Sequence, residues 1–187
     1  GVIVDSAGLI VTNHHVIDNS SVVRVIFEDG RMYEASIIGS DKLTDVGLIK
    51  INATNLVPIS IGNSDEMLVG DLAVAIGHPL TLGAAPTVTT GIVSALERRL
   101  DVGGDVMGSE VTLFGLIQTD APITRGSSGG ALINKNGELI GITTAIATAD
   151  VGAEGLGFAV PINLALNIAE DILLDGKVLH AFLGILG

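Results

Sequence analysis

The 187-residue chain contains no cysteine and no tryptophan, and aromatic residues make up only 3% of it. The absence of cysteine excludes disulfide bonds, thiol catalysis and thiolate zinc sites. Because aromatic side chains are so scarce, Val, Ile, Leu and Ala must fill the core. Hydrophobic residues still amount to 48%, so the composition is that of a packed globular protein with one or two small cores.

Positive charge is also scarce, with 9 Lys and Arg against 21 Asp and Glu, and the formal net charge is −12. An acidic surface repels phosphate backbones, so we expect no nucleic-acid partner. No apolar run reaches the roughly 20 residues that a membrane helix needs, so we expect no membrane insertion in this segment. A signal-peptide pattern is missing too, which predicts that any signal or anchor segment lies outside this chain.

Eleven short apolar runs separated by turn-forming residues predict β-strands. They cover 2–5, 9–12, 21–27, 33–39, 46–51, 71–77, 87–96, 113–119, 130–134, 138–146 and 156–162. The pair Asn136-Gly137 between two of these runs predicts a hairpin. The polar, glycine-rich residues 97–110 are typical of a surface loop.

Only residues 163–176 have the pattern of a substantial helix. Their apolar positions fall on one face at helical spacing: Ala165, Ile168, Ala169, Ile172 and Leu173. Asn163 is the expected N-cap and Gly176 the expected C-terminal stop. Many short strands followed by one helix predict an all-β protein built from two small barrels or sandwiches.

The stretch "TRGSSGGALIN" places Ser128 between glycines. Taken alone, it fits the nucleophile elbow of α/β-hydrolases, but that elbow requires a helix directly after the serine and the chain order Ser, Asp, His. A predicted hairpin follows here, and the only histidine downstream is His180. The alternative is the two-barrel protease, whose chain order is His, Asp, Ser.

Upstream residues supply that order. His14 and His15 follow an apolar strand, and Asp45 directly precedes another. An imidazole can remove the proton of a serine hydroxyl, and a carboxylate can hold the imidazole in the required tautomer. Asp41 is a rival for the acid, although it lies further from the strand that follows.

A metal site is the weaker interpretation of the two histidines. His14, His15 and Asp18 could be pictured as three ligands, but nothing in the sequence supplies the rest of a coordination shell. We therefore expect neither a metal nor a cofactor.

Five motifs in this chain resemble, in order, those of the HtrA/Deg family of trypsin-like serine proteases. They are "VTNHHV", "TDVGLIKI", "QTDAPITRGSSGGALIN", "GELIGITTAI" and "GLGFAVPIN". The resemblance covers essentially the whole chain and implies an all-β fold of two six-stranded antiparallel β-barrels of the trypsin-like (chymotrypsin) type, with a C-terminal α-helix. It divides the chain into a barrel at 1–65, with its first strand expected upstream, a barrel at 66–162, a helix at 163–176 and a tail at 177–187 towards an absent PDZ domain.

The resemblance also implies the site residues. The family's catalytic histidine corresponds to His15 rather than His14, its aspartate to Asp45 and its serine to Ser128. The oxyanion hole corresponds to Gly126, Ser127 and Ser128. The walls of the primary substrate pocket correspond to Ile123, Thr144, Ala145, Gly157, Phe158 and Ala159, and these small or apolar side chains predict cleavage after small or medium aliphatic residues.

The implied function is ATP-independent endopeptidase activity on unfolded or misfolded proteins, in protein quality control and stress response. The resemblance further implies a homotrimer and an extracytoplasmic, periplasm-like location. One motif departs from the family, because Thr124-Arg125-Gly126-Ser127 replaces its usual "NPGN" in a loop that switches between inactive and active shapes. The alternative function is therefore a chaperone-like binding module whose triad is held inactive by a collapsed oxyanion loop.

Overall fold

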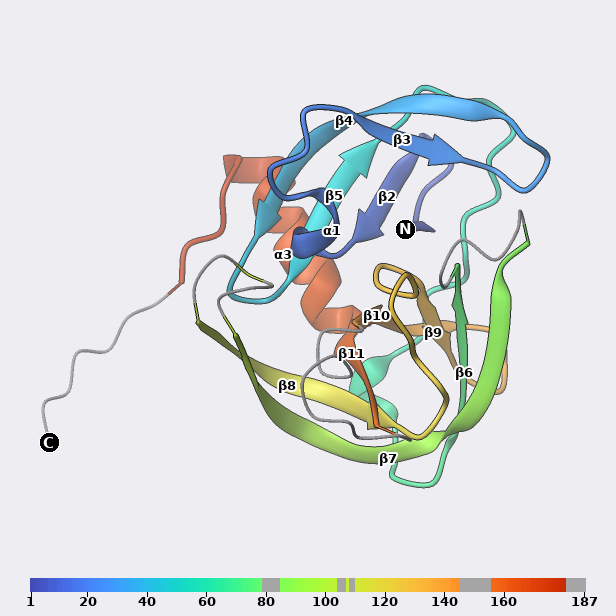
Figure 1. The fold of residues 1–187 in the computed structure, drawn as a ribbon, viewed down its shortest axis with the longest axis vertical. Helices are drawn as coiled ribbons and strands as arrows, with labels where there is room; N and C mark the ends of the chain where they lie inside the picture. The colour runs from blue at the N-terminus through green and yellow to red at the C-terminus, as the bar shows by residue number, and fades with distance from the viewer. Residues whose placement is uncertain (79–84, 104–106, 108–109, 145–155, 181–187) are drawn as a thin grey trace, which may run out of the picture.

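The computed structural model describes residues 1–78, 85–103, 107, 110–144 and 156–180. Its first half is a five-stranded antiparallel sheet, the N-terminal sheet, with strand order β1-β2-β5-β4-β3 (Figure 1). The strands are β1 (Val2–Ile3), β2 (Leu9–Thr12), β3 (Val23–Ile26), β4 (Met32–Asp41) and β5 (Val46–Lys50). Each lies within or across one of the runs predicted for this half.

The second half is a closed six-stranded barrel, the C-terminal barrel, with order β10-β11-β8-β7-β6-β9. Its strands are β6 (Leu72–Gly77), β7 (Thr87–Val102), β8 (Val111–Thr119), β9 (Ala131–Ile133), β10 (Leu139–Thr144) and β11 (Gly157–Pro161). The predicted hairpin joins β9 to β10, with Gly137 at φ +77. The all-β fold class is thus confirmed, with a closed six-stranded barrel in the second half and a five-stranded sheet in the first half, where a second six-stranded barrel was expected.

The expected surface loop at 97–110 is wrong in its first part, because β7 continues to Val102. Asp101 and Val102 pair with Thr112 and Val111 of β8. The polar composition suggested a loop because one side of this part of β7 faces solvent. The exposed Arg99 and Asp101 form a 2.9 Å ion pair on that side, while Val102 is buried. Residues 104–106, 108 and 109 of the same stretch lie outside the described residues.

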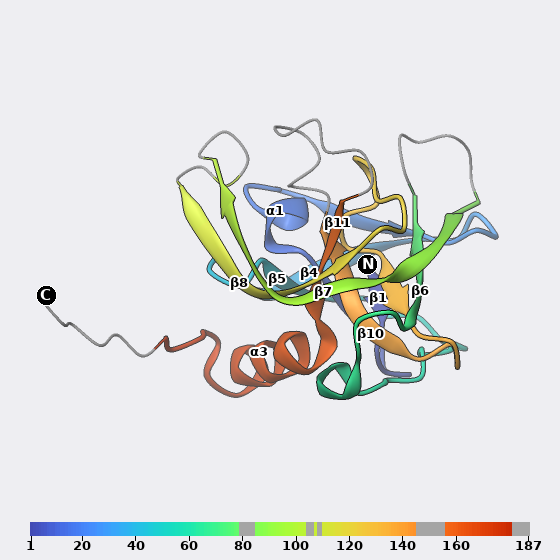
Figure 2. The ribbon, with the colours of Figure 1, turned by 90° about the horizontal axis from the view of Figure 1, so that it is seen from below.

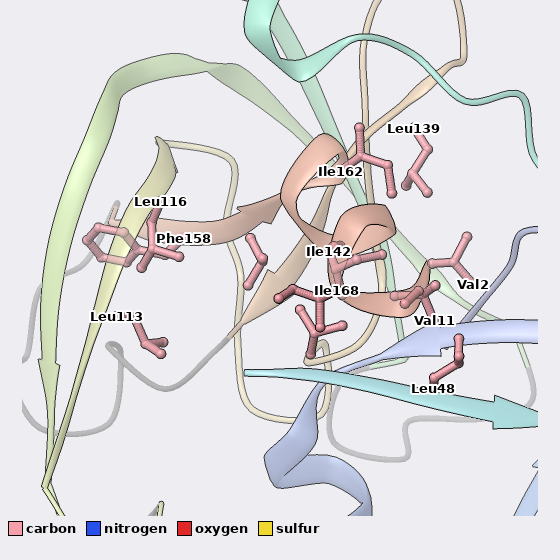
Figure 3. Close-up of a cluster of buried hydrophobic side chains, with 14 of the residues drawn as sticks. Val2, Val11, Leu48, Leu113, Leu116, Leu139, Ile142, Phe158, Ile162 and Ile168 are labelled. Atoms are coloured by element: carbon pink, nitrogen blue, oxygen red, sulfur yellow. The ribbon is translucent and has the colours of Figure 1, made fainter. Parts of the chain in front are cut away.

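The main hydrophobic core lies between the two halves (Figure 3). Val11 and Leu48 reach it from the N-terminal sheet, and Ile142 and Phe158 from the C-terminal barrel. All residues of β10 are buried, as are the first four of β5, because both strands are covered on both faces. A second apolar cluster fills the barrel, and a third lies on the other face of the N-terminal sheet.

Helix α3 (Ile162–Asp175) closes one side of this core and contacts β4 and β5 as well as β10 and β11 (Figure 2). Its buried positions are Ile162, Ala165, Ile168, Ala169 and Ile172. The predicted inward position of Leu173 is wrong, since that side chain is 53% exposed. Gly176 ends the helix in the left-handed conformation, as the sequence predicts.

The predicted N-cap is also wrong: Pro161 occupies that position, and Asn163 lies inside the first turn. The Asn163 side chain instead reaches the 3₁₀-helix η1 (Ser64–Glu66), where its amide donates to Asn63 Oδ1 at 2.7 Å. Neither η1 nor the four-residue helix α1 (His14–Ile17) was predicted, because both are too short to show helical periodicity. No helix in the described part of the chain has the length and apolar character needed to cross a bilayer.

Candidate active site

His15 and Asp45 meet where α1 lies against the start of β5. The Nδ1 atom of His15 is 2.9 Å from each carboxylate oxygen of Asp45, and the His15 backbone N–H donates to Oδ1 at 3.1 Å. The Asp45 side chain is fully buried, whereas the His15 side chain is 14% exposed. A carboxylate only accepts, so Nδ1 carries the hydrogen and Nε2 is left as the basic nitrogen.

Asp45 is held from both halves of the molecule. Its backbone has φ +55, a conformation that side-chain-bearing residues adopt rarely. From the N-terminal half, its carbonyl accepts hydrogen bonds from the His14 N–H at 3.2 Å and the Asn13 side-chain amide at 3.0 Å. From the C-terminal barrel, the Thr144 hydroxyl donates to Oδ2 at 3.1 Å. The carboxylate therefore sits at the junction with fixed orientation.

The segment before Ser128 is a tight turn. Ser127 N–H donates to Thr124 O at 2.9 Å, and Gly126 has φ +92, as the third residue of a type II turn requires. The Ser127 carbonyl accepts a 2.6 Å hydrogen bond from the Thr143 hydroxyl. Ser127 is buried, while Arg125 is exposed to solvent.

Close backbone approach explains the glycines that surround this turn. A Cβ at Gly129 (φ +79) would lie 2.3 Å from Thr12 Oγ1, and one at Gly130 would lie 2.3 Å from the backbone oxygen of Ile76. The end of β6 and the tip of β2 thus press directly on the peptide units that follow Ser128, where no larger residue fits.

The two halves of the candidate triad lie side by side. The Gly129 N–H, in the peptide unit that follows Ser128, donates to Asn13 Oδ1 at 2.6 Å, and Asn13 is two residues before His15. The structure therefore brings the predicted serine loop against the segment that carries the predicted base and acid.

The predicted pocket residues divide between two places. Ile123 packs on Gly157, where a Cβ would lie 2.8 Å from Ile123 Cδ1, and Ala159 joins Ile123 in the barrel cluster. Phe158 packs in the core between the halves, near Leu116 (Figure 3). The Thr144 hydroxyl donates its hydrogen bond to the Asp45 carboxylate. Ala145 lies outside the described residues.

A cavity of about 140 Å³ borders the turn at Thr124 and Ser127. The described residues that line it are Ala75, Ile76, Gly77, Thr87, Thr89, Pro122, Thr124, Ser127 and Thr143. None of them belongs to the predicted walls of the substrate pocket. Ser127 is the one residue that the cavity shares with the predicted oxyanion segment.

The rival interpretations are not supported by the geometry. Asp41 contacts His180 Nε2 at 2.8 Å and accepts two hydrogen bonds from Thr44, so it is engaged away from His15. His14 contacts the Ser40 hydroxyl at 2.8 Å through Nδ1. Within the described ranges, no group of three or more His, Asp and Glu side chains could hold a metal ion.

Sequence reasoning missed Asn13 and the hydroxyl role of Thr144. Both are almost completely buried polar residues at the ends of apolar strands. A polar residue that ends an apolar strand is the available signal, but only the fold reveals its partner.

The known proteins that this chain resembles are peptidases. A trypsin-like peptidase domain matches residues 1–142. The periplasmic serine endoprotease DegP of Salmonella typhimurium is 50% identical over the whole chain, and DegP of Escherichia coli K12 is 48% identical. The chain spans 38% of the length of each of these relatives.

Solved structures agree with this match. The HtrA-type protease AlgW, solved with a decapeptide, superposes with a TM-score of 0.81 at 40% identity, covering 94% of this chain and 51% of that one. A serine endoprotease from Yersinia pestis gives a TM-score of 0.81 at 42% identity, over 100% of this chain and 61% of that one.

Proposed function

Because the chain belongs to the trypsin-like peptidase family, in its HtrA/Deg branch, we propose that it is a serine endopeptidase that works through an acyl-enzyme. Ser128 is the nucleophile, His15 the general base and Asp45 the group that orients the imidazole. The observation that carries the proposal is the 2.9 Å contact between His15 Nδ1 and a fully buried Asp45 carboxylate, next to the serine loop.

The chemistry follows from this arrangement. With Nδ1–H bound to Asp45, Nε2 is free to take the Ser128 proton as the hydroxyl attacks a peptide carbonyl, and then to deliver it to the leaving amine. The backbone N–H groups of Gly126 and Ser128 stabilise the oxyanion, and losing one such donor typically costs about 3 kcal/mol in the barrier. The turn at Gly126 orients these groups.

The predicted pocket walls and the relatives support a substrate class. Ile123 and Gly157 already touch, and no acidic side chain lies on the described part of the predicted wall. A pocket of this kind suits Val, Ile or Ala before the scissile bond and rejects Lys or Arg. As in its periplasmic relatives, we place the protein outside the cytoplasm. There it degrades unfolded protein as a homotrimer, without ATP.

Casein digestion tests the proposal. The wild-type chain should release fragments, and Ser128→Ala and His15→Ala should release none. His14→Ala is the matched control, because the ring of this adjacent histidine contacts Ser40, and the backbone N–H that donates to the Asp45 carbonyl is kept in alanine. If wild type leaves casein intact yet suppresses its aggregation, the chaperone-like alternative replaces the peptidase.

A further inference from the structure

The side chain of Asn13 does not cap the helix that follows it. It occupies the N-cap position of α1 with an extended backbone (φ −89°, ψ 152°), where an Asn side chain normally accepts a hydrogen bond from the first turn. Here it makes no cap hydrogen bond. Departures from local rules are expected chiefly where a functional site requires them.

The side chain instead bridges the two halves of the molecule. Asn13 is 0% exposed. Its Oδ1 accepts from the Gly129 N–H at 2.6 Å, and its Nδ2 donates to the Asp45 carbonyl at 3.0 Å. Only this amide orientation fits, because the reverse would set N–H against N–H and oxygen against oxygen. A carboxylate could not supply the donor, and an alkyl group could supply neither bond.

One hydrogen-bond partner of Asn13 is the residue that follows Ser128, and the other is Asp45 itself. The Gly129 N–H shares a peptide unit with the Ser128 carbonyl, so holding that N–H fixes the backbone orientation at Ser128. The same N–H also donates to Thr143 O at 2.9 Å inside the barrel. On the other side, the Asp45 carbonyl belongs to a residue in the left-handed conformation, which persists only when its surroundings hold it.

We propose that Asn13 is a positioning residue for catalysis: one buried amide fixes the Ser128–Gly129 peptide and the Asp45 backbone at the same time, and so sets the nucleophile on one half against the base and acid on the other. This inference rests on the proposed peptidase function. Asn13 does not touch the reacting atoms, so its effect belongs to the geometry of the site rather than to substrate affinity. A misplacement of about 1 Å can lower the rate roughly 100-fold.

The test compares Asn13→Ala, Asn13→Asp and Asn13→Ser with wild type in hydrolysis of a Val-containing peptide. We expect kcat to fall roughly 10- to 100-fold with KM changed less than about threefold. Asn13→Asp keeps the acceptor for Gly129 but sets a buried carboxylate oxygen against the Asp45 carbonyl oxygen, so its kcat should fall at least as far as that of Asn13→Ala. If Asn13→Ala fails to fold, Asn13→Asp and Asn13→Ser decide the question.

Asn163→Ala is the matched control. Asn163 also bridges two segments through its side chain, α3 to the residues of η1, but it lies away from the serine loop. It should lose stability with kcat within about twofold of wild type. Folded Asn13 variants with wild-type kcat, or an equal loss of kcat in Asn163→Ala, would overturn the proposal.

Hydrogen exchange separates this inference from the peptidase assignment. The Gly129 amide proton should be protected in wild type and Ser128→Ala, and exchange at least about tenfold faster in Asn13→Ala. If wild type hydrolyses nothing and a fluorophosphonate fails to label Ser128, the peptidase proposal fails, while the exchange result still reports whether Asn13 holds the loop. Unchanged exchange in Asn13→Ala would refute the positioning role even in an active enzyme.

Discussion

The hydroxyl of Thr144, on the C-terminal barrel, donates a 3.1 Å hydrogen bond to Oδ2 of Asp45, which directly precedes β5 of the N-terminal sheet. Its neighbour Thr143 points to the other face of β10 and donates to the Ser127 carbonyl at 2.6 Å. Two successive hydroxyls of one strand thus hold the acid and the serine loop of the candidate site.

Replacing Thr144 by valine removes this donor and keeps the side-chain shape. Hydrogen bonds to charged groups contribute about 1.5–3 kcal/mol, so we expect kcat to fall roughly tenfold or more. Steady-state kinetics measure the change. Thr90→Val, an exposed threonine on β7, is the control and should keep wild-type kcat.

The pH dependence of kcat/KM should report the proposed base. His15 can take the Ser128 proton only when its imidazole is neutral, so kcat/KM should rise from acidic to neutral pH and then level off. A profile that stays flat across this range would count against His15.

Gly130→Ala should destabilise the serine loop. The added Cβ would lie 2.3 Å from the Ile76 carbonyl oxygen, and backbone cannot move aside cheaply. We expect a loss of about 1–3 kcal/mol, measured by urea unfolding, together with loss of activity. At Gly103 a Cβ would meet nothing within 4 Å, so Gly103→Ala should leave the unfolding midpoint unchanged.

Ile172→Ala tests the contact between α3 and the N-terminal sheet. Ile172 is 2% exposed, and its Cγ2 lies 2.6 Å from where Gly39 would carry a Cβ. Truncation should lower the free energy of unfolding by about 2–5 kcal/mol. Leu174→Ala removes a similar side chain that is 74% exposed, and should change it by less than about 0.5 kcal/mol. Equal effects would mean that α3 does not dock as described.

Glu138 in the β9–β10 hairpin should titrate below the ordinary range of a glutamate. Side-chain amides of Asn134 and then Asn136 donate to its carboxylate and lower its pKa. A lowered pKa means that the hairpin gains stability from this group above the ordinary pKa and loses it as the pH falls through the lowered value. NMR titration should show the midpoint rising in Asn134→Ala. An unchanged midpoint would mean that the amide of Asn134 does not hold the carboxylate.

The sequence by itself determined the strands, the single long helix and the order of His15, Asp45 and Ser128, because these depend on periodicity, turn-forming residues and short motifs. It could not assign the N-cap of α3, since the Asn163 side chain bonds to Asn63, a residue far from it in the chain. It read part of β7 as loop, since a strand that faces solvent is as polar as a loop.

Only the tertiary structure decided that the Asn13 side chain bonds to Gly129 and Asp45 instead of capping α1. The same holds for the hydrogen bond from the Thr144 hydroxyl to the Asp45 carboxylate. Local patterns record which side chains prefer a strand or a helix, but a buried polar atom takes whatever partner the fold brings within 3 Å. Those partners come from opposite halves of the protein, so the geometry of the site appears only when the halves meet.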